Sequence, residues 1–353
     1  MVLSNSDLAH FEEHGYVVVR GVLAEPDFAA VRREYTDTLT ERAAAWRVAG
    51  RLSGGEEYGA LPFPEHIVAL AGLPGFDASL LAELDITLPH MPFTYLRPDS
   101  ELHTGPAVLG LLRNPKVLDV VGSLVGDEIK ASPNQHVRLK LPVRDTPTAF
   151  GGRKGETMYA PTMWHQDAMT QIPESDDTDL ITCWIPLGDV DEGNGCLTVV
   201  PGGHRSDELL PWPMDADTVA RLERAAVPIP VRKGDLVLLH KRLPHGSRVN
   251  TSDALRWSFD FRYFRADQPS DRPWFPNITV RSRRDPAREL TDAAEWRRRW
   301  EDARAFHVAA GAPLPGRREF AQLVADALIR GWESGNYPVL GEEAESVPAV
   351  AGH

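Results

Sequence analysis

A histidine and an aspartate lie two positions apart in the segment Met163-Trp164-His165-Gln166-Asp167. In an extended chain, side chains two positions apart point to the same face, about 6.6 Å apart along the strand. One imidazole and one carboxylate on one face can bind a single metal ion. A second imidazole would complete the two-His-one-carboxylate triad of non-haem Fe(II) oxygenases. His-x-Asp is a short pattern that also occurs on surface strands, so the third ligand has to come from elsewhere.

His245 is the candidate for that third ligand. It follows the apolar run 236–239 and lies in the segment Leu243-Pro244-His245-Gly246-Ser247, where Pro and Gly indicate a tight turn after a strand. Such a turn exposes the imidazole. We therefore predict that His165, Asp167 and His245 bind one metal ion and act as the catalytic residues.

A second constellation follows in the strand expected over 255–264. Its apolar face consists of Leu255, Trp257, Phe259 and Phe261, and its polar face of Arg256, Ser258, Asp260 and Arg262. A guanidinium beside a hydroxyl suits a carboxylate, because arginine can bind a carboxylate through two parallel hydrogen bonds. A half-exposed strand with solvated charges is the more common source of such alternation, and that interpretation stays open.

The elements that position these residues follow from periodicity and turn signals. Helices are expected at 7–14, 26–46, 107–125, 292–307 and 317–334, and strands at 16–20, 135–141, 180–187, 196–200, 235–240 and 255–264. Helices, then strands, then helices predict an α+β fold with a sandwich or barrel core. We expect one domain over 1–340, a flexible tail over 341–353, and an insertion or lid over 201–228.

Composition limits the function classes. The chain has 353 residues, 42% of them hydrophobic, and a net charge of −13. An acidic protein is a poor general binder of nucleic acid or of an anionic membrane surface. The expected location is cytoplasmic, because the sequence shows no apolar run of about 18 residues, no evident signal peptide and few cysteines. Cys183 and Cys196 are expected to be buried apolar side chains, and the oligomeric state is not readable.

Taken in order, these segments resemble the phytanoyl-CoA dioxygenase family of Fe(II)/2-oxoglutarate-dependent oxygenases. His165-Gln-Asp167 matches the family's His-x-Asp, His245 its distal histidine, and Arg256, eleven residues later, its co-substrate arginine. Trp184-Ile-Pro-Leu and the segments 192–205 and 11–21 also resemble the family. The resemblance extends from about residue 7 to residue 276.

The resemblance implies a double-stranded β-helix, or jelly roll, that binds Fe(II), 2-oxoglutarate and O2. It implies hydroxylation of a small organic metabolite with release of succinate and CO2. Arg256 would bind the far carboxylate of 2-oxoglutarate with Ser258 or Ser247. The further candidates for co-substrate contact are Lys140, Arg138, Trp184 and Gln135. Asp167 disfavours halogenation, because related halogenases have a small residue at that position.

Two other functions remain open at this level. One is a jelly-roll binding protein that has lost turnover, and the other is a cupin-like zinc metalloenzyme. Several residues also have two interpretations. His240 and His204 are expected to be structural, His136 is either core or site, and Gln166 is either a strand-edge contact or close to substrate. Lid or pocket positions are further possible roles for the aromatic residues Trp212, Trp274 and Phe275.

Overall fold

The computed structural model describes residues 2–88, 98–142, 162, 164–211, 214–273 and 275–310. The helix expected at 317–334, the tail at 341–353 and the side chains of Trp212 and Trp274 lie outside these residues. The single-domain assignment over 1–340 therefore stays a prediction. Among the described residues, no helix is both long and apolar enough to cross a bilayer.

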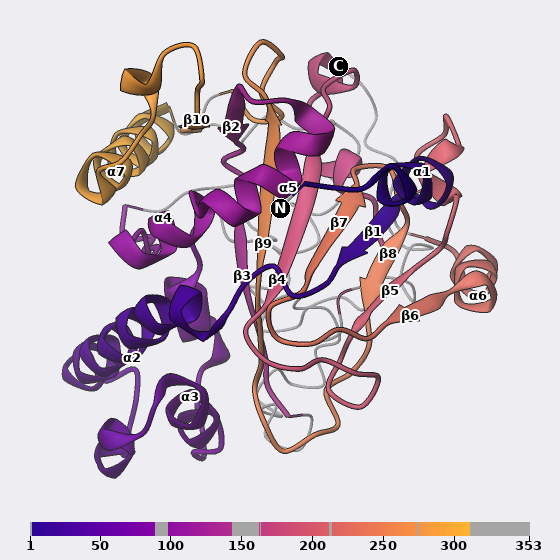
Figure 1. Ribbon diagram of the computed structural model, residues 1–353. Helices are drawn as coiled ribbons and strands as arrows, with labels where there is room; N and C mark the ends of the chain where they lie inside the picture. Colours follow the sequence, from indigo (N-terminus) through magenta and orange to yellow (C-terminus); the bar gives the residue numbers. More distant parts are fainter. Residues whose placement is uncertain are drawn as a thin grey trace, which may run out of the picture.

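Two antiparallel sheets form the centre of the molecule (Figure 1). The larger, seven-stranded sheet has the order β1-β7-β4-β9-β2-β10, with β3 also paired to β9. Its strands are β1 (Tyr16–Val19), β2 (Ile129–Ala131), β3 (His136–Lys140), β4 (Ile181–Pro186), β7 (Leu236–His240), β9 (Arg256–Arg265) and β10 (Ile278–Arg281). The smaller sheet has the order β6-β5-β8, with β5 (Leu197–Val199), β6 (Val227–Ile229) and β8 (His245–Ser247).

Helices cover the outer face of the larger sheet, where α4 and α5 cross its strands and α2 lies beside them (Figure 1). The α-helices are α1 (Asn5–His14), α2 (Glu25–Val48), α3 (Phe63–Ala71), α4 (Pro106–Leu112), α5 (Pro115–Val125), α6 (Ala216–Ala225) and α7 (Ala293–Ala310). Short 3-10 helices are η1 (Glu56–Ala60), η2 (Ala78–Leu84), η5 (Asp167–Thr170), η6 (Pro173–Ser175), η7 (Gly203–Arg205) and η8 (Pro286–Arg288).

Both faces of the larger sheet are buried. In β7, Leu236 and Leu238 pack into the cluster under the helices, whereas Val237 and Leu239 pack with residues of the smaller sheet. Because successive side chains point to opposite faces, a strand covered on both sides has a continuous apolar sequence. The run Leu236–Leu239 has this character.

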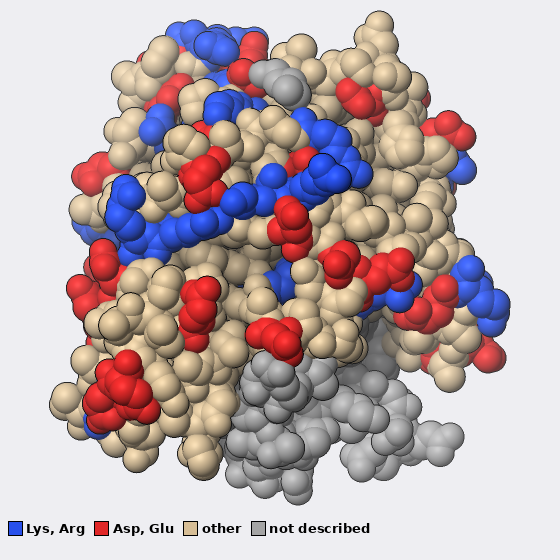
Figure 2. Space-filling model, turned by 60° about the horizontal axis from the view of Figure 1, so that its bottom comes forward, with Lys and Arg blue, Asp and Glu red and all other residues tan. Residues whose placement is uncertain are grey.

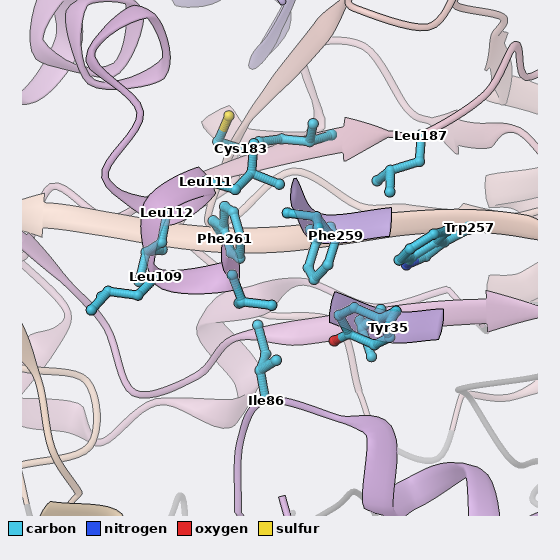
Figure 3. Close-up of a cluster of buried hydrophobic side chains, with 14 of the residues drawn as sticks. Tyr35, Ile86, Leu109, Leu111, Leu112, Cys183, Leu187, Trp257, Phe259 and Phe261 are labelled. Atoms are coloured by element: carbon cyan, nitrogen blue, oxygen red, sulfur yellow. The ribbon is translucent and has the colours of Figure 1, made fainter. Parts of the chain in front are cut away.

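The cluster under the helices is rich in aromatic side chains. Figure 3 shows Trp257, Phe259 and Phe261 along β9, with Tyr35 of α2 packed on the same side. The ring centroid of Tyr35 lies 5.1 Å from that of Trp257 and 5.9 Å from that of Phe259. Its hydroxyl donates to the carbonyl oxygen of Leu84 at 3.1 Å, so its buried polar atom has a partner.

Two expectations need correction. The helix expected over 107–125 is two helices, because Asn114 caps α5 by accepting from the amide of Lys116 and Pro115 occupies the first turn. The strand over 255–264 is not a half-exposed edge. β9 pairs with β2, β3 and β4, and its residues from Arg256 to Phe264 are buried.

The other elements predicted within the described residues are found with shifts of a few residues at their ends. The inner cluster joins Trp184 and Val237 of the larger sheet to Leu197, Val199 and Ile229 of the smaller sheet. Two facing antiparallel sheets around one such cluster, with helices outside, form an α+β fold with a jelly-roll core. The predicted fold class is therefore confirmed.

Surface charge is grouped rather than even. Figure 2 shows a band of Lys and Arg side chains across one face, with acidic side chains on both sides of it. The net charge of −13 therefore does not describe every part of the surface.

Candidate metal centre

The two candidate histidine ligands are held against each other by their backbones. The amide of His165 donates to the carbonyl of His245 at 2.9 Å, and the amide of His245 donates to the carbonyl of His165 at 2.9 Å. His245 begins β8, which pairs with β5. The two imidazoles therefore lie side by side, with ring centroids 4.1 Å apart.

Asp167 lies close to the two histidines, but its local backbone structure differs from the extended strand that was expected. The chain is extended at Gln166, but Asp167 begins the 3-10 helix η5, so the two ligands do not lie on one regular strand. The carboxylate still returns to the histidines, with 3.7 Å between Asp167 Oδ1 and His165 Nε2. One ligand atom from each of His165, Asp167 and His245 lies within 4.8 Å of the other two. Among the described residues, this is the one group of at least three such side chains.

The carboxylate of Asp167 is fixed by two neighbours from the larger sheet. Arg262 Nη2 donates to Oδ1 at 2.7 Å, and the hydroxyl of Thr182 donates to Oδ2. Burial raises the pKa of Asp167, but Arg262 and the two histidines outweigh burial and hold that pKa well below its usual range. Asp167 is therefore an ionised, oriented carboxylate, and a carboxylate has free lone pairs left for a metal ion.

A cavity beside the triad contains Arg256. Its lining includes His165 and His245 together with Thr182, Trp184, Arg256 and Asp260. Arg256 is 3% exposed, donates to the hydroxyl of Ser258 at 2.6 Å, and lies 5.6 Å from the ring centroid of Trp184. Its Nε has no hydrogen-bond partner. The site therefore contains a buried guanidinium that still has a donor to offer.

Burial acts against the charged form of Arg256. Burial lowers the pKa of Arg256 to about 9; Asp260 opposes this shift, and Arg138 adds to it. The carboxylate of Asp260 accepts from Arg138 Nε at 2.8 Å. A buried charge is costly without a partner. The buried guanidinium of Arg256 would therefore favour binding of an anionic ligand next to it.

The other predicted co-substrate residues differ in placement. Lys140 lies opposite Arg256 in the β3–β9 pairing, and its Nζ donates to Thr162 Oγ1 at 3.1 Å. The hydroxyl of Ser247 accepts from the amide of Thr162 at 2.9 Å. These two side chains therefore meet at Thr162, which lines the cavity.

The side chain of Gln135 forms hydrogen bonds with backbone groups instead. Its amide nitrogen donates to the carbonyl oxygens of Ser132 at 2.5 Å and of Arg262 at 2.9 Å, and its oxygen accepts from the amide of Arg262 at 2.9 Å. Its side-chain groups are used in joining β9 to the turn before β3. This placement gives no support to the predicted contact with the co-substrate.

The other histidines considered in the sequence, His136, His204 and His240, lie outside the triad. His204 Nε2 bonds to the carbonyl oxygen of Glu12 at 3.1 Å, and the amide of Arg242 donates to His240 Nδ1 at 3.1 Å. His136 is a core residue, 2.9 Å from a carboxylate oxygen of Asp85. Cys183 and Cys196 are buried and free.

Sequence reasoning did not identify the partners of Asp167. Arg262 shares the polar face of β9 with Arg256, so the alternation pattern was the available signal. Its partner could not be inferred, because the two residues are 95 positions apart. Thr182 lies in a strand that reads as apolar and has no sequence feature that points to the site.

Comparison with known proteins adds independent support. A family model described as phytanoyl-CoA dioxygenase matches residues 85–258, which include His165, Asp167, His245 and Arg256. Over these residues the chain matches the phytanoyl-CoA dioxygenase family.

Curated relatives of this family align over parts of their length. The rat phytanoyl-CoA dioxygenase domain-containing protein 1 is 29% identical over 172 residues, covering 46% of this chain and 54% of the relative. The zebrafish protein of the same name is 33% identical, over 24% of this chain and 33% of its own. A probable phytanoyl-CoA dioxygenase of Caenorhabditis elegans is 21% identical over 75% of this chain and 77% of its own. In the first two comparisons, the alignment spans a third to about half of the relative.

Solved structures show the same fold. The chain is similar to the non-heme monooxygenase ThoJ in its apo form, with a TM-score of 0.51, 17% identity, and coverage of 86% of this chain and 97% of that one. At this identity the similarity shows the fold alone.

Proposed function

We propose that this protein is an Fe(II)- and 2-oxoglutarate-dependent oxygenase that hydroxylates a small organic molecule. The observation that carries the proposal is the position of Arg256. A buried arginine with an unpartnered Nε lines the same cavity as the two histidines of the candidate metal centre.

The three ligand atoms suit Fe(II). Two imidazole nitrogens and one carboxylate oxygen form the donor set of non-haem Fe(II) oxygenases, which leaves coordination positions open for other ligands. His245 Nδ1 lies 2.9 Å from the carbonyl oxygen of Leu243, so Nε2 is the nitrogen available for the metal. Such a bond fixes the tautomer and the ring orientation of a ligand histidine.

The cavity suits a dicarboxylate co-substrate. One carboxylate of 2-oxoglutarate would bind Arg256 and Ser258, while its other end would reach the metal. Trp184, Leu197 and Leu239 provide apolar walls between polar groups. An arginine fork is selective for a carboxylate, because both groups are planar and can form two parallel bonds.

The residues of the chain bind, orient and exclude water. His165, Asp167 and His245 would hold the metal, and Arg256 would fix the co-substrate's orientation. When bound, iron and 2-oxoglutarate supply the oxygen-activating chemistry, with succinate and CO2 as the products of the co-substrate. No side-chain general base is required for this reaction, and we assign none.

Two other functions give different results in the same assays. A binding protein without turnover would bind ligand without oxygen-dependent succinate release, and a zinc metalloenzyme would be active without 2-oxoglutarate. The arrangement of Arg256 and Ser258 favours the oxygenase over both. The cytoplasmic location and the identity of the substrate remain predictions to be tested separately.

The experiment begins with anaerobic addition of Fe(II) and 2-oxoglutarate to the purified protein. We expect a weak visible charge-transfer band, followed by succinate formation when oxygen is admitted in the presence of a substrate. A metabolite screen that monitors succinate would find that substrate. Absence of both the band and iron uptake would contradict the proposed function.

A further inference from the structure

The residues on both sides of His165 are held by the insertion between β5 and β6. Trp164 precedes the ligand, and Gln166 follows it. Both side chains bond to the described part of the insertion, which includes α6. The position of one candidate ligand is therefore connected to a segment outside the sheets.

Trp164 makes the first connection. Its indole Nε1 donates to Glu223 Oε1 at 2.5 Å. Trp164 is 7% exposed, whereas Glu223 lies on α6, a helix whose one buried side chain is Leu222. A helix with so little buried apolar surface gains little from packing. Its bond to Trp164 therefore adds to the packing of Leu222 in holding the helix in place.

Gln166 makes the second connection. Its side-chain oxygen accepts from the amide of Leu210 at 2.7 Å, and its nitrogen donates to the carbonyl of Arg242 at 2.6 Å. Gln166 is 1% exposed. Its amide therefore joins the insertion to the turn that leads to His245. These bonds are consistent with the interpretation of Gln166 as a polar contact.

We propose that Glu223 and Gln166 are positioning residues that hold His165 at the metal centre, so that docking of α6 and metal binding stabilise each other. The proposal rests on the proposed function, because it requires a metal at His165. Ligands bind more tightly when their supporting contacts are already formed. By thermodynamic linkage, a helix that strengthens metal binding is itself stabilised by the metal.

The first test measures affinity for Co(II) alone by visible absorption, without turnover. For Glu223→Ala and for Trp164→Phe we expect a dissociation constant about three- to tenfold higher, the range for loss of one hydrogen bond. Glu223→Gln keeps the acceptor and should stay close to the unsubstituted protein. The double variant should be no weaker than either single variant, because both remove the same bond.

The second test measures hydrogen exchange of α6 with and without Co(II). We expect metal to slow exchange in residues 216–225 of the unsubstituted protein and to have a smaller effect in Glu223→Ala. Asp217→Ala is the matched control, because it removes an exposed carboxylate from the same helix and leaves Trp164 untouched. Its metal affinity and its exchange response should not change.

The outcomes separate the two proposals. Equal Co(II) affinity for Glu223→Ala and the unsubstituted protein, with no metal effect on α6 exchange, would overturn the positioning role alone. Failure of the unsubstituted protein to bind Co(II) would overturn the proposed function itself. Weaker binding in Asp217→Ala of the same size as in Glu223→Ala would also overturn the role of the Trp164 bond.

Discussion

His165 and His245 exchange both of their backbone hydrogen bonds, each at 2.9 Å. The side chains of the two candidate ligands are thus neighbours because their backbones are paired. Substitution of either imidazole leaves the backbone pairing in place. The metal centre can therefore be disrupted without removing the structure that supports it.

His165→Ala and His245→Ala are each expected to abolish iron-dependent succinate release. Each substitution removes one of the three protein ligands and leaves one imidazole and one carboxylate to bind the metal. Metal content and succinate formation are the measurements, and far-ultraviolet circular dichroism should match the unsubstituted protein. Succinate release at the unsubstituted rate would refute the ligand assignment.

Asp167→Asn should lower stability as well as metal affinity. Arg262 is 2% exposed and would lose its buried anionic partner, and breaking a buried ion pair costs about 3–5 kcal/mol. Urea unfolding of the metal-free variants measures the free energy of unfolding. The double variant Asp167→Asn with Arg262→Met should recover part of that stability without recovering metal binding. Recovery of metal binding in the double variant would show that Asp167 is not a ligand.

Arg256→Ala should chiefly raise the concentration of 2-oxoglutarate required for half-maximal activity. Removal of one member of a buried charge pair costs about 2–5 kcal/mol, which is roughly thirtyfold or more in affinity. Ser258→Ala removes one hydrogen bond and should cause a smaller increase. Arg248→Ala is the control, because Arg248 is exposed and pairs with Glu192 at the surface. An unchanged requirement in Arg256→Ala would argue against the proposed co-substrate site.

Acid should destabilise the protein through His240. Burial lowers the pKa of His240 from 6.5 to about 4. The folded state thus holds this imidazole neutral, and the unfolded state binds the proton more readily. The stability that the neutral His240 contributes is fully present above about pH 6.5 and is lost as the pH falls towards 4.

All but one of the charged groups around His240 lower its pKa, as burial does. Its pKa is lowered further by His204, Lys241 and Arg242, and it is raised by Asp179. We expect the melting temperature to fall between pH 7 and pH 4.5, and His240→Gln to reduce the slope. A slope unchanged by this substitution would assign the acid sensitivity to other groups. These ranges follow from the pKa of about 4 in the folded state and the ordinary histidine value of 6.5.

The sequence predicts the parts of this protein that depend on local pattern. The apolar run at 236–239 predicts a strand, and the alternation in β9 predicts which residues share its polar face. The short patterns around His165 and His245 locate the candidate ligands because their residue types and order are informative. In each case, the relevant information lies within a few positions of the residue concerned.

Other features depend on contacts between distant segments. Asp167 lies at the start of a 3-10 helix, and its orientation comes from Arg262 and Thr182, which belong to different strands. The bond between Trp164 and Glu223 depends on how the insertion folds back. The break at Asn114 was readable in principle, since Asn-Pro is a helix-start signal that the apolar periodicity obscured.

Strand β1 adds a constraint on how the chain acquires this structure. Tyr16 pairs with Leu239, so this strand has its partner far along the chain. Long-range pairing of this kind delays folding, and exposed strands are prone to aggregation in the interval. His245 begins β8, the strand after β7, so the metal centre also needs a part of the chain that follows the partner of β1. Metal can then stabilise only chains that have been synthesised past this point.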